Sequence, residues 1–130
     1  MRLASSSAEK RAFPRVSVKL TAHCQVGTRF VRDQLVDLSE RGLYLKTREP
    51  VREGAAVRVA LALPFEDGPR YCTLGGVVVR VDRDPRGVTT GLGMSFAGVA
   101  SSALDVLRGF LARATPVSSG IGRGLSSGRE

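Results

Sequence analysis

The chain has 130 residues, which is enough for one domain that buries a hydrophobic core without disulfides or metal ions. Its apolar share of 42% and charged share of 25% are typical of a water-soluble globular protein, and its longest apolar runs are far too short to cross a bilayer. The net charge of +8 favours anionic partners, whether nucleotides, nucleic acid or acidic protein surfaces, without choosing among them.

The N-terminal stretch MRLASSSAEK lacks the apolar segment of a signal peptide, so a cytoplasmic location without membrane insertion is expected. The two cysteines, Cys24 and Cys72, fall in different predicted strands and have no C-x-x-C spacing. We therefore predict that both are buried free thiols in a reducing compartment, with no disulfide or metal-binding role.

The first half of the chain predicts three strands. Residues 1–8 are small and polar and are expected to form a flexible N-terminal segment. A strand is then predicted over residues 16–24, because apolar side chains occupy every second position. These apolar residues are Val16, Val18, Leu20, Ala22 and Cys24. A second strand over residues 30–38 alternates less cleanly, and Gly42 precedes a third over residues 43–46.

Three further strands and one helix are predicted in the second half. Residues 57–63 show the cleanest alternation, and a polar hairpin loop is predicted over residues 64–69. The next strand covers residues 71–82, where the pair Gly75 and Gly76 suggests a bulge or a sharp bend. The last strand covers residues 91–96.

A helix should close the domain. Ser102 and Asp105 resemble a capping box. One helical face carries the apolar residues Leu104, Leu107, Phe110 and Leu111, and is expected to cover the barrel mouth. Residues 114–130, rich in Ser, Gly and Arg, are predicted to be a disordered tail. Six short strands and one helix predict an all-β fold, namely a six-stranded antiparallel barrel with one C-terminal helix.

Two short motifs suggest a ligand site. Arg11 and Arg15 precede the first strand, and Pro14 disfavours a helix there, so their side chains are free to turn towards a ligand. Their guanidinium groups match phosphate oxygens and the O6/N7 edge of guanine, and Lys10 adds a further cation. Taken alone, this stretch is explained more simply by a solvated basic N-terminus.

The second motif is Asp37-x-Ser39-x-x-Gly42, between the second and third predicted strands. Asp37 offers acceptors for the N1 and N2 groups of guanine, and Ser39 offers a donor or an acceptor. Gly42 permits a close approach that a Cβ would block. The alternative is an ordinary turn in which Asp37 and Ser39 bond to their own backbone.

The two motifs together, RxxxR followed by DxSxxG, resemble the signature of the PilZ domain family. The resemblance covers residues 9–113. Residues 76–79 and 91–96 are similar to the family's late strands, and residues 104–111 are similar to its closing helix. The resemblance therefore implies the PilZ-type barrel.

The resemblance also implies binding of cyclic diguanylate (c-di-GMP), a bacterial second messenger with two phosphates and two guanines. The arginines of the first motif match those that grip phosphate and guanine in the family, and Arg41, at a variable position of the second motif, is expected to add a phosphate contact. The expected ligand-binding residues are Lys10, Arg11, Arg15, Asp37, Ser39, Arg41 and Gly42. A chain of this length leaves no room for an output domain, so a standalone receptor would pass the signal to an unidentified effector protein in motility, biofilm or envelope regulation.

Two rival functions stay open. A PilZ-fold adaptor would work through protein contacts without the nucleotide. A nucleic-acid-binding barrel is disfavoured, because the chain has only seven aromatic residues and no RNP-like motif. Enzymatic activity is not expected, since His23 has no partner at ligand or catalytic spacing, and neither a metal site nor a cofactor is predicted. Tyr44 and Tyr71 are expected to pack on the barrel.

Overall fold

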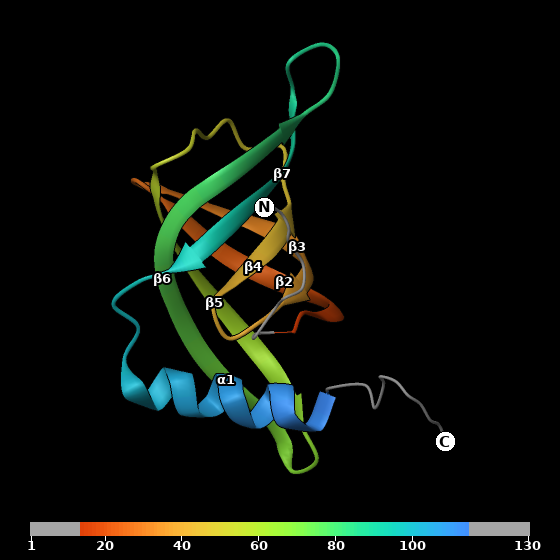
Figure 1. The fold of residues 1–130 in the computed structure, drawn as a ribbon, viewed down its shortest axis with the longest axis vertical. Coiled ribbons are helices and arrows are strands. Elements are labelled where there is room, and N and C mark those ends of the chain that lie inside the picture. The colour runs from red at the N-terminus through yellow and green to blue at the C-terminus, as the bar shows by residue number, and fades with distance from the viewer. Residues whose placement is uncertain (1–13, 115–130) are drawn as a thin grey trace, which may run out of the picture.

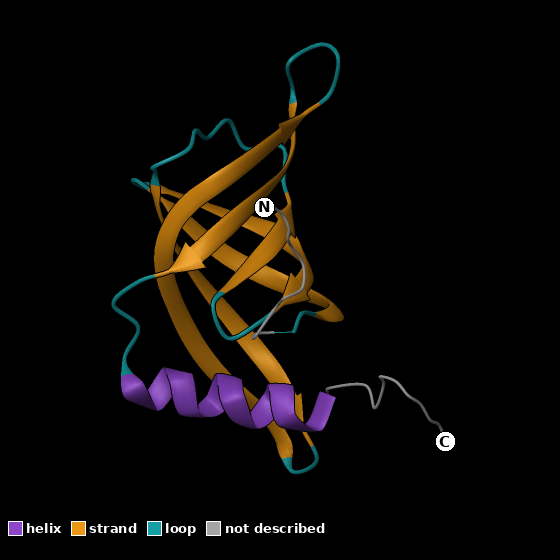
Figure 2. Ribbon diagram, viewed as in Figure 1, coloured by secondary structure: helices purple, strands orange, loops and turns teal. Residues whose placement is uncertain are grey.

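Six antiparallel strands close into a barrel, and one helix follows them (Figures 1 and 2). The structure is a computed structural model and describes residues 14–114. The strands are neighbours around the barrel in the order β2-β3-β4-β7-β6-β5. Their bounds are β2 Val16–Val26, β3 Arg29–Leu38, β4 Gly42–Lys46, β5 Ala56–Phe65, β6 Gly68–Arg83 and β7 Thr89–Phe96, and the helix is α1 Ser101–Ala114. The predicted fold class is confirmed.

The barrel interior is filled mainly by leucine. Inward positions alternate with outward ones along each strand, and the inward side chains are almost completely removed from water. The largest of these are Leu35, Leu38, Leu43, Leu45, Leu61, Leu63, Leu74, Leu92 and Met94. Burying one such side chain contributes about 1.5–3 kcal/mol, so this interior is the main source of the barrel's stability.

Two irregularities in the strand pairing position the motif residues. The register shifts between Ser17 and Leu20 in the β2–β3 pair, and between Leu35 and Asp37 in the β3–β4 pair. Such bulges re-aim the side chains that follow them. After the second shift Asp37 lies opposite Tyr44, while Leu38 still enters the core. The last outward-facing side chain of β3 is therefore the carboxylate of Asp37.

The β5–β6 hairpin is longer than the sequence suggested. The loop predicted over residues 64–69 is wrong, because Phe65 pairs with Gly68 and only residues 66 and 67 lie between the two strands. Gly68 has a φ of 120°, which suits the tight turn. Pro64 is tolerated in β5 because β5 pairs with β2 only over residues 57–60, so the proline removes no bond to that strand.

The glycine pair in β6 carries no bulge. The register of β6 with β5 runs without a break through Gly75 and Gly76. The shift falls instead on the β7 side, between Val78 and Arg80. Gly76 serves close packing, since a Cβ there would lie 2.0 Å from the backbone oxygen of Ser95.

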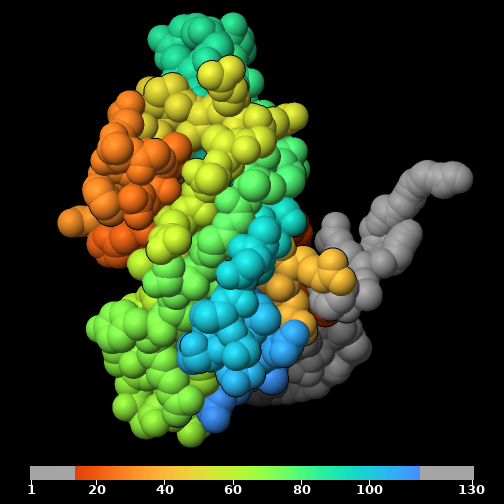
Figure 3. All heavy atoms as spheres, turned by 90° about the vertical axis from the view of Figure 1, so that its left-hand side faces the viewer, coloured from red at the N-terminus to blue at the C-terminus, as the bar shows by residue number. Residues whose placement is uncertain are grey.

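Helix α1 packs against the hairpin formed by β5 and β6 (Figure 3). Three of its four predicted apolar residues, Leu107, Phe110 and Leu111, are buried, and the Phe110 ring meets that of Phe65 edge-on at 6.4 Å. The capping-box prediction is wrong, because the helix begins at Ser101 and Ser102 therefore lies inside the first turn. The helix is too short and too polar to cross a membrane.

The prediction that both cysteines pack in the core is confirmed. Cys24 in β2 and Cys72 in β6 are buried free thiols. Burial raises the pKa of both thiols, and for Cys24 the nearby Asp33 raises it further, to about 12. A raised pKa leaves little thiolate at neutral pH, and the thiolate is the reactive form.

We therefore expect both thiols to be almost inert towards Ellman's reagent at pH 8 in the folded protein. Unfolding in guanidinium chloride should release two reactive thiols per chain. Rapid reaction of either thiol in the native protein, with the fold intact by circular dichroism, would contradict their burial.

Candidate functional site

The two motifs meet at one end of the barrel. Arg15 directly precedes β2, and Asp37 lies near the end of β3, where it pairs with Ser17. The Nη1 of Arg15 lies 2.6 Å from Oδ1 of Asp37, with 43% and 26% of the two side chains exposed. The structure thus joins the second arginine of the first motif to the carboxylate of the second. Lys10 and Arg11 lie outside the described residues.

Ser39 closes the turn between β3 and β4. Its hydroxyl donates to the carbonyl of Gly42 and accepts from the backbone N–H groups of Arg41 and Gly42, each at 3.2 Å. Its own N–H donates to the same Gly42 carbonyl at 2.9 Å. Ser39 is also 3% exposed. Ser39 therefore bonds to its own backbone turn, as expected if the motif is an ordinary turn. Asp37 does not, because its carboxylate bonds to the side chain of Arg15.

Gly42 is required by packing. A Cβ at this position would lie 2.2 Å from the backbone oxygen of Met94 in β7. The close approach at Gly42 is made by a neighbouring strand, and contact with a ligand stays a prediction. This glycine holds β4 tightly against β7, which fixes the turn that precedes it.

The turn is also hydrogen-bonded to β7 and to α1. The carbonyl of Arg41 accepts from the N–H of Phe96 at 2.8 Å, and Nε of Arg108 in α1 donates to Glu40 at 3.1 Å. The Arg41 side chain is exposed beside these contacts. Ligand contacts at this turn would thus act on a segment that touches both β7 and α1.

A second polar network lies on the same outer face and was missed in the sequence. The hydroxyl of Tyr44 donates to Oδ2 of Asp82, and Arg80 bonds both oxygens of Asp82 at 3.1 Å through Nε and Nη2. The Arg80 guanidinium lies 5.5 Å from the centre of the Tyr44 ring. The spacing of Arg80 and Asp82, two apart in a predicted strand, is the one signal that could have placed them together.

This network shifts the pKa values of its members. Partial burial, followed by the bond to Asp82, raises the pKa of Tyr44 to about 12. The hydrogen bonds from Tyr44 and Arg80 lower the pKa of Asp82. At neutral pH the phenol is therefore a donor and Asp82 a carboxylate, which holds Arg80 in place. Tyr44 packs on the barrel as predicted, but Tyr71 does not, with 77% of it exposed.

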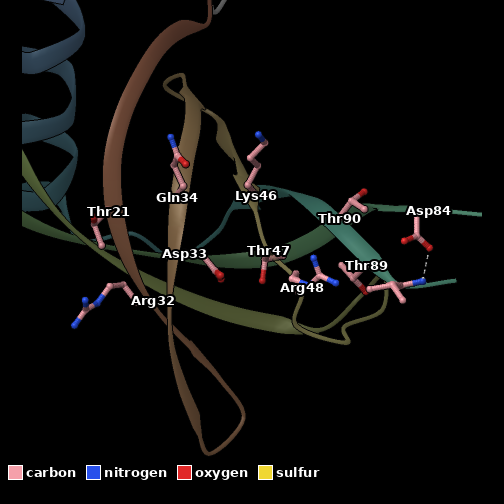
Figure 4. A pocket seen from close by; sticks show the side chains of 11 residues that line it. Thr21, Arg32, Asp33, Gln34, Lys46, Thr47, Arg48, Asp84, Thr89 and Thr90 are labelled. Carbon is pink, nitrogen blue, oxygen red and sulfur yellow. Dashed lines mark hydrogen bonds between the residues drawn. The ribbon is translucent and has the colours of Figure 1, made fainter. Parts of the chain in front are cut away.

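A polar cleft of about 530 Å³ lies farther along β3 and β4, beside the β6–β7 loop (Figure 4). Gln34 and Lys46 point to one side of these strands, whereas Asp33 and Thr47 point to the other (Figure 4). Burial raises the pKa of Asp33, although a hydrogen bond with Thr47 opposes the shift. The cationic and acidic side chains of the cleft do not converge on one point, and among residues 14–114 no group of acidic, His or Cys side chains could hold a metal ion.

Comparison with known proteins finds similarity in sequence and in fold. A family model described as "PilZ domain" matches residues 9–113. No curated protein sequence matches the chain. Solved structures with a similar fold include the PilZ domain with c-di-GMP of YcgR from Escherichia coli, at a TM-score of 0.63 and 16% identity, covering 82% of this chain and 92% of that one.

Two longer proteins also share the fold. The inhibitor of motility MotI/DgrA from Bacillus subtilis gives a TM-score of 0.67 at 19% identity, covering 81% of this chain and 51% of that one. The MrkH–c-di-GMP complex from K. pneumonia gives 0.61 at 18% identity, covering 81% and 52%. The chain thus spans about half the length of these two proteins.

Proposed function

The chain belongs to the PilZ domain family, and on that premise we propose that it is a cytoplasmic receptor for c-di-GMP that passes the signal to a partner protein. The observation that carries this proposal is the contact between Arg15 and Asp37, which joins the two motifs on the barrel surface at 2.6 Å. Two of the similar structures, from YcgR and MrkH, are complexes with c-di-GMP.

The chemistry of the pair suits one guanylate unit of the ligand. Arg15 offers planar paired donors to phosphate or to the O6/N7 edge of guanine, while Asp37 accepts from guanine N1 and N2. Both side chains are partly exposed, so a ligand can reach them without opening the core. Lys10, Arg11 and Arg41 would supply further cations, and Ser39 and Gly42 would hold the backbone on which Asp37 and Arg41 sit.

The partner would be a protein of motility, biofilm or envelope regulation that recognises the liganded barrel. The name of the similar inhibitor of motility supports the first of these processes. The turn from Ser39 to Gly42 is the expected route for the signal, since it contacts β7 through Phe96 and α1 through Arg108.

Calorimetric titration with c-di-GMP tests the proposal directly. We expect saturable binding of c-di-GMP. Binding of c-di-AMP should be much weaker because Asp37 selects for guanine, and binding of GTP should be much weaker because the site selects for a cyclic dinucleotide. If c-di-GMP gives no binding under conditions where the protein is folded, the receptor proposal fails.

The alternative is a PilZ-fold adaptor that binds protein without the nucleotide. It is favoured by two large side chains left on the barrel surface, Phe30 and Tyr71, which are 76% and 77% exposed. Aromatic residues of this kind are enriched at protein interfaces. An adaptor would capture the same partner whether or not c-di-GMP is present, whereas a receptor would capture it in a manner that depends on the ligand.

A further inference from the structure

A row of four residues crosses the outer face of the barrel and begins at the motif. Asp37 of β3 pairs with Tyr44 of β4, Tyr44 pairs with Gly93 of β7, and Gly93 pairs with Arg80 of β6. Neighbouring strands lie about 4.8 Å apart, so the row extends roughly 14 Å from Asp37 to Arg80. The Arg15–Asp37 pair occupies one end of this row, and the Arg80–Asp82 pair occupies the other.

Two glycines of β7, Gly91 and Gly93, leave space for the Tyr44 ring on the outer face of the sheet. A Cβ at Gly91 would lie 2.1 Å from the Tyr44 hydroxyl, and one at Gly93 would lie 3.8 Å from its ring. The Tyr44 ring therefore lies down over β7 and reaches Asp82 on the next strand. A larger residue in place of Gly91 would lift the ring and separate these groups.

The Arg80 side chain lies over the outer side of the Tyr44 ring. Its Nε and Nη2 face Asp82, and its guanidinium lies over the Tyr44 ring. The guanidinium is thus bonded to a carboxylate along one edge and lies over an aromatic ring. Its side chain remains 67% exposed, so its outer face is open to a ligand.

We propose that the Arg80–Asp82 pair is a stacking platform for the second guanine of c-di-GMP, the base that Arg15 and Asp37 do not hold. This inference rests on the proposed function. Arginine planes and aromatic rings are the surfaces on which proteins stack unpaired bases. A platform at the far end of the row extends the site to a second nucleotide unit, which a mononucleotide would not occupy.

The test compares Arg80→Lys, Arg80→Ala and Arg70→Ala by calorimetric titration with c-di-GMP. Arg70 is a matched control, because it bonds Asp67 at 3.1 Å and lies 4.4 Å from the centre of the Phe65 ring, at the hairpin tip. We expect about a tenfold loss of affinity for Arg80→Ala, nearly the same loss for Arg80→Lys, and less than a twofold change for Arg70→Ala. Lysine keeps the charge but has no plane, so a platform cannot be restored by it.

Each other outcome overturns the platform. Equal losses for Arg80→Ala and Arg70→Ala would mean that only net charge matters. Recovery of wild-type affinity in Arg80→Lys would mean that a point charge is sufficient. In either case wild-type binding and its loss in Arg15→Ala would leave the receptor function standing, whereas absence of wild-type binding would remove both proposals.

Discussion

Replacing Arg15 with alanine should weaken c-di-GMP binding by roughly one to two orders of magnitude. Charge-assisted hydrogen bonds of a guanidinium contribute about 1.5–3 kcal/mol, and each ~1.4 kcal/mol is a tenfold change in affinity. The substitution also leaves Asp37 without the cation that lies 2.6 Å away. An uncompensated carboxylate would then lie in the site of an anionic ligand and weaken binding further.

Two arginine substitutions serve as controls for net charge. Arg70→Ala removes an exposed arginine that is also paired with an aspartate, and Arg123→Ala removes one beyond the described residues. All three variants lose the same charge, so a difference in affinity between them cannot come from net charge. If calorimetry gives the three variants the same affinity, binding is diffuse electrostatic attraction and the assignment of the motifs to the site is wrong.

The sequence placed both motifs at strand ends, but it did not predict that they contact each other. Alternating apolar residues placed Val16 at the start of one strand and Leu38 at the end of the next, and antiparallel pairing then brings Arg15 and Asp37 together. The same reasoning could not predict the role of Ser39. Its hydroxyl is satisfied by backbone groups within three residues, and a pattern of residue types does not distinguish such a turn from a ligand contact.

The network of Tyr44, Arg80 and Asp82 could not be predicted from the sequence for a different reason. Its members come from two strands that are not paired with each other, with β7 between them. A shift in the β6–β7 register, between Val78 and Arg80, brings Arg80 opposite Gly93 in the row. Bulges of this kind depend on the fit of neighbouring strands, so the alternation of one strand does not reveal them.

Gly76→Ala should destabilise the barrel strongly, whereas Gly75→Ala should not. A Cβ at Gly76 would lie 2.0 Å from the Ser95 oxygen and 3.0 Å from the Phe96 Cα, both backbone atoms of the adjacent strand. Relief requires β6 and β7 to separate where they are paired. Overpacking of this kind costs about 3 kcal/mol, which lowers the melting temperature of a domain of this size by roughly 15 °C.

The neighbouring glycine is the matched control. A Cβ at Gly75 would have the Ala97 oxygen as its nearest neighbour at 3.8 Å, an ordinary contact. Both substitutions restrict the unfolded chain equally, by about 0.4–1 kcal/mol in favour of folding, so any difference between them reports on the folded barrel. Thermal unfolding followed by circular dichroism should therefore separate two variants that the sequence alone makes equivalent. Equal melting temperatures would mean that β6 and β7 do not approach as closely at Gly76 as the barrel requires.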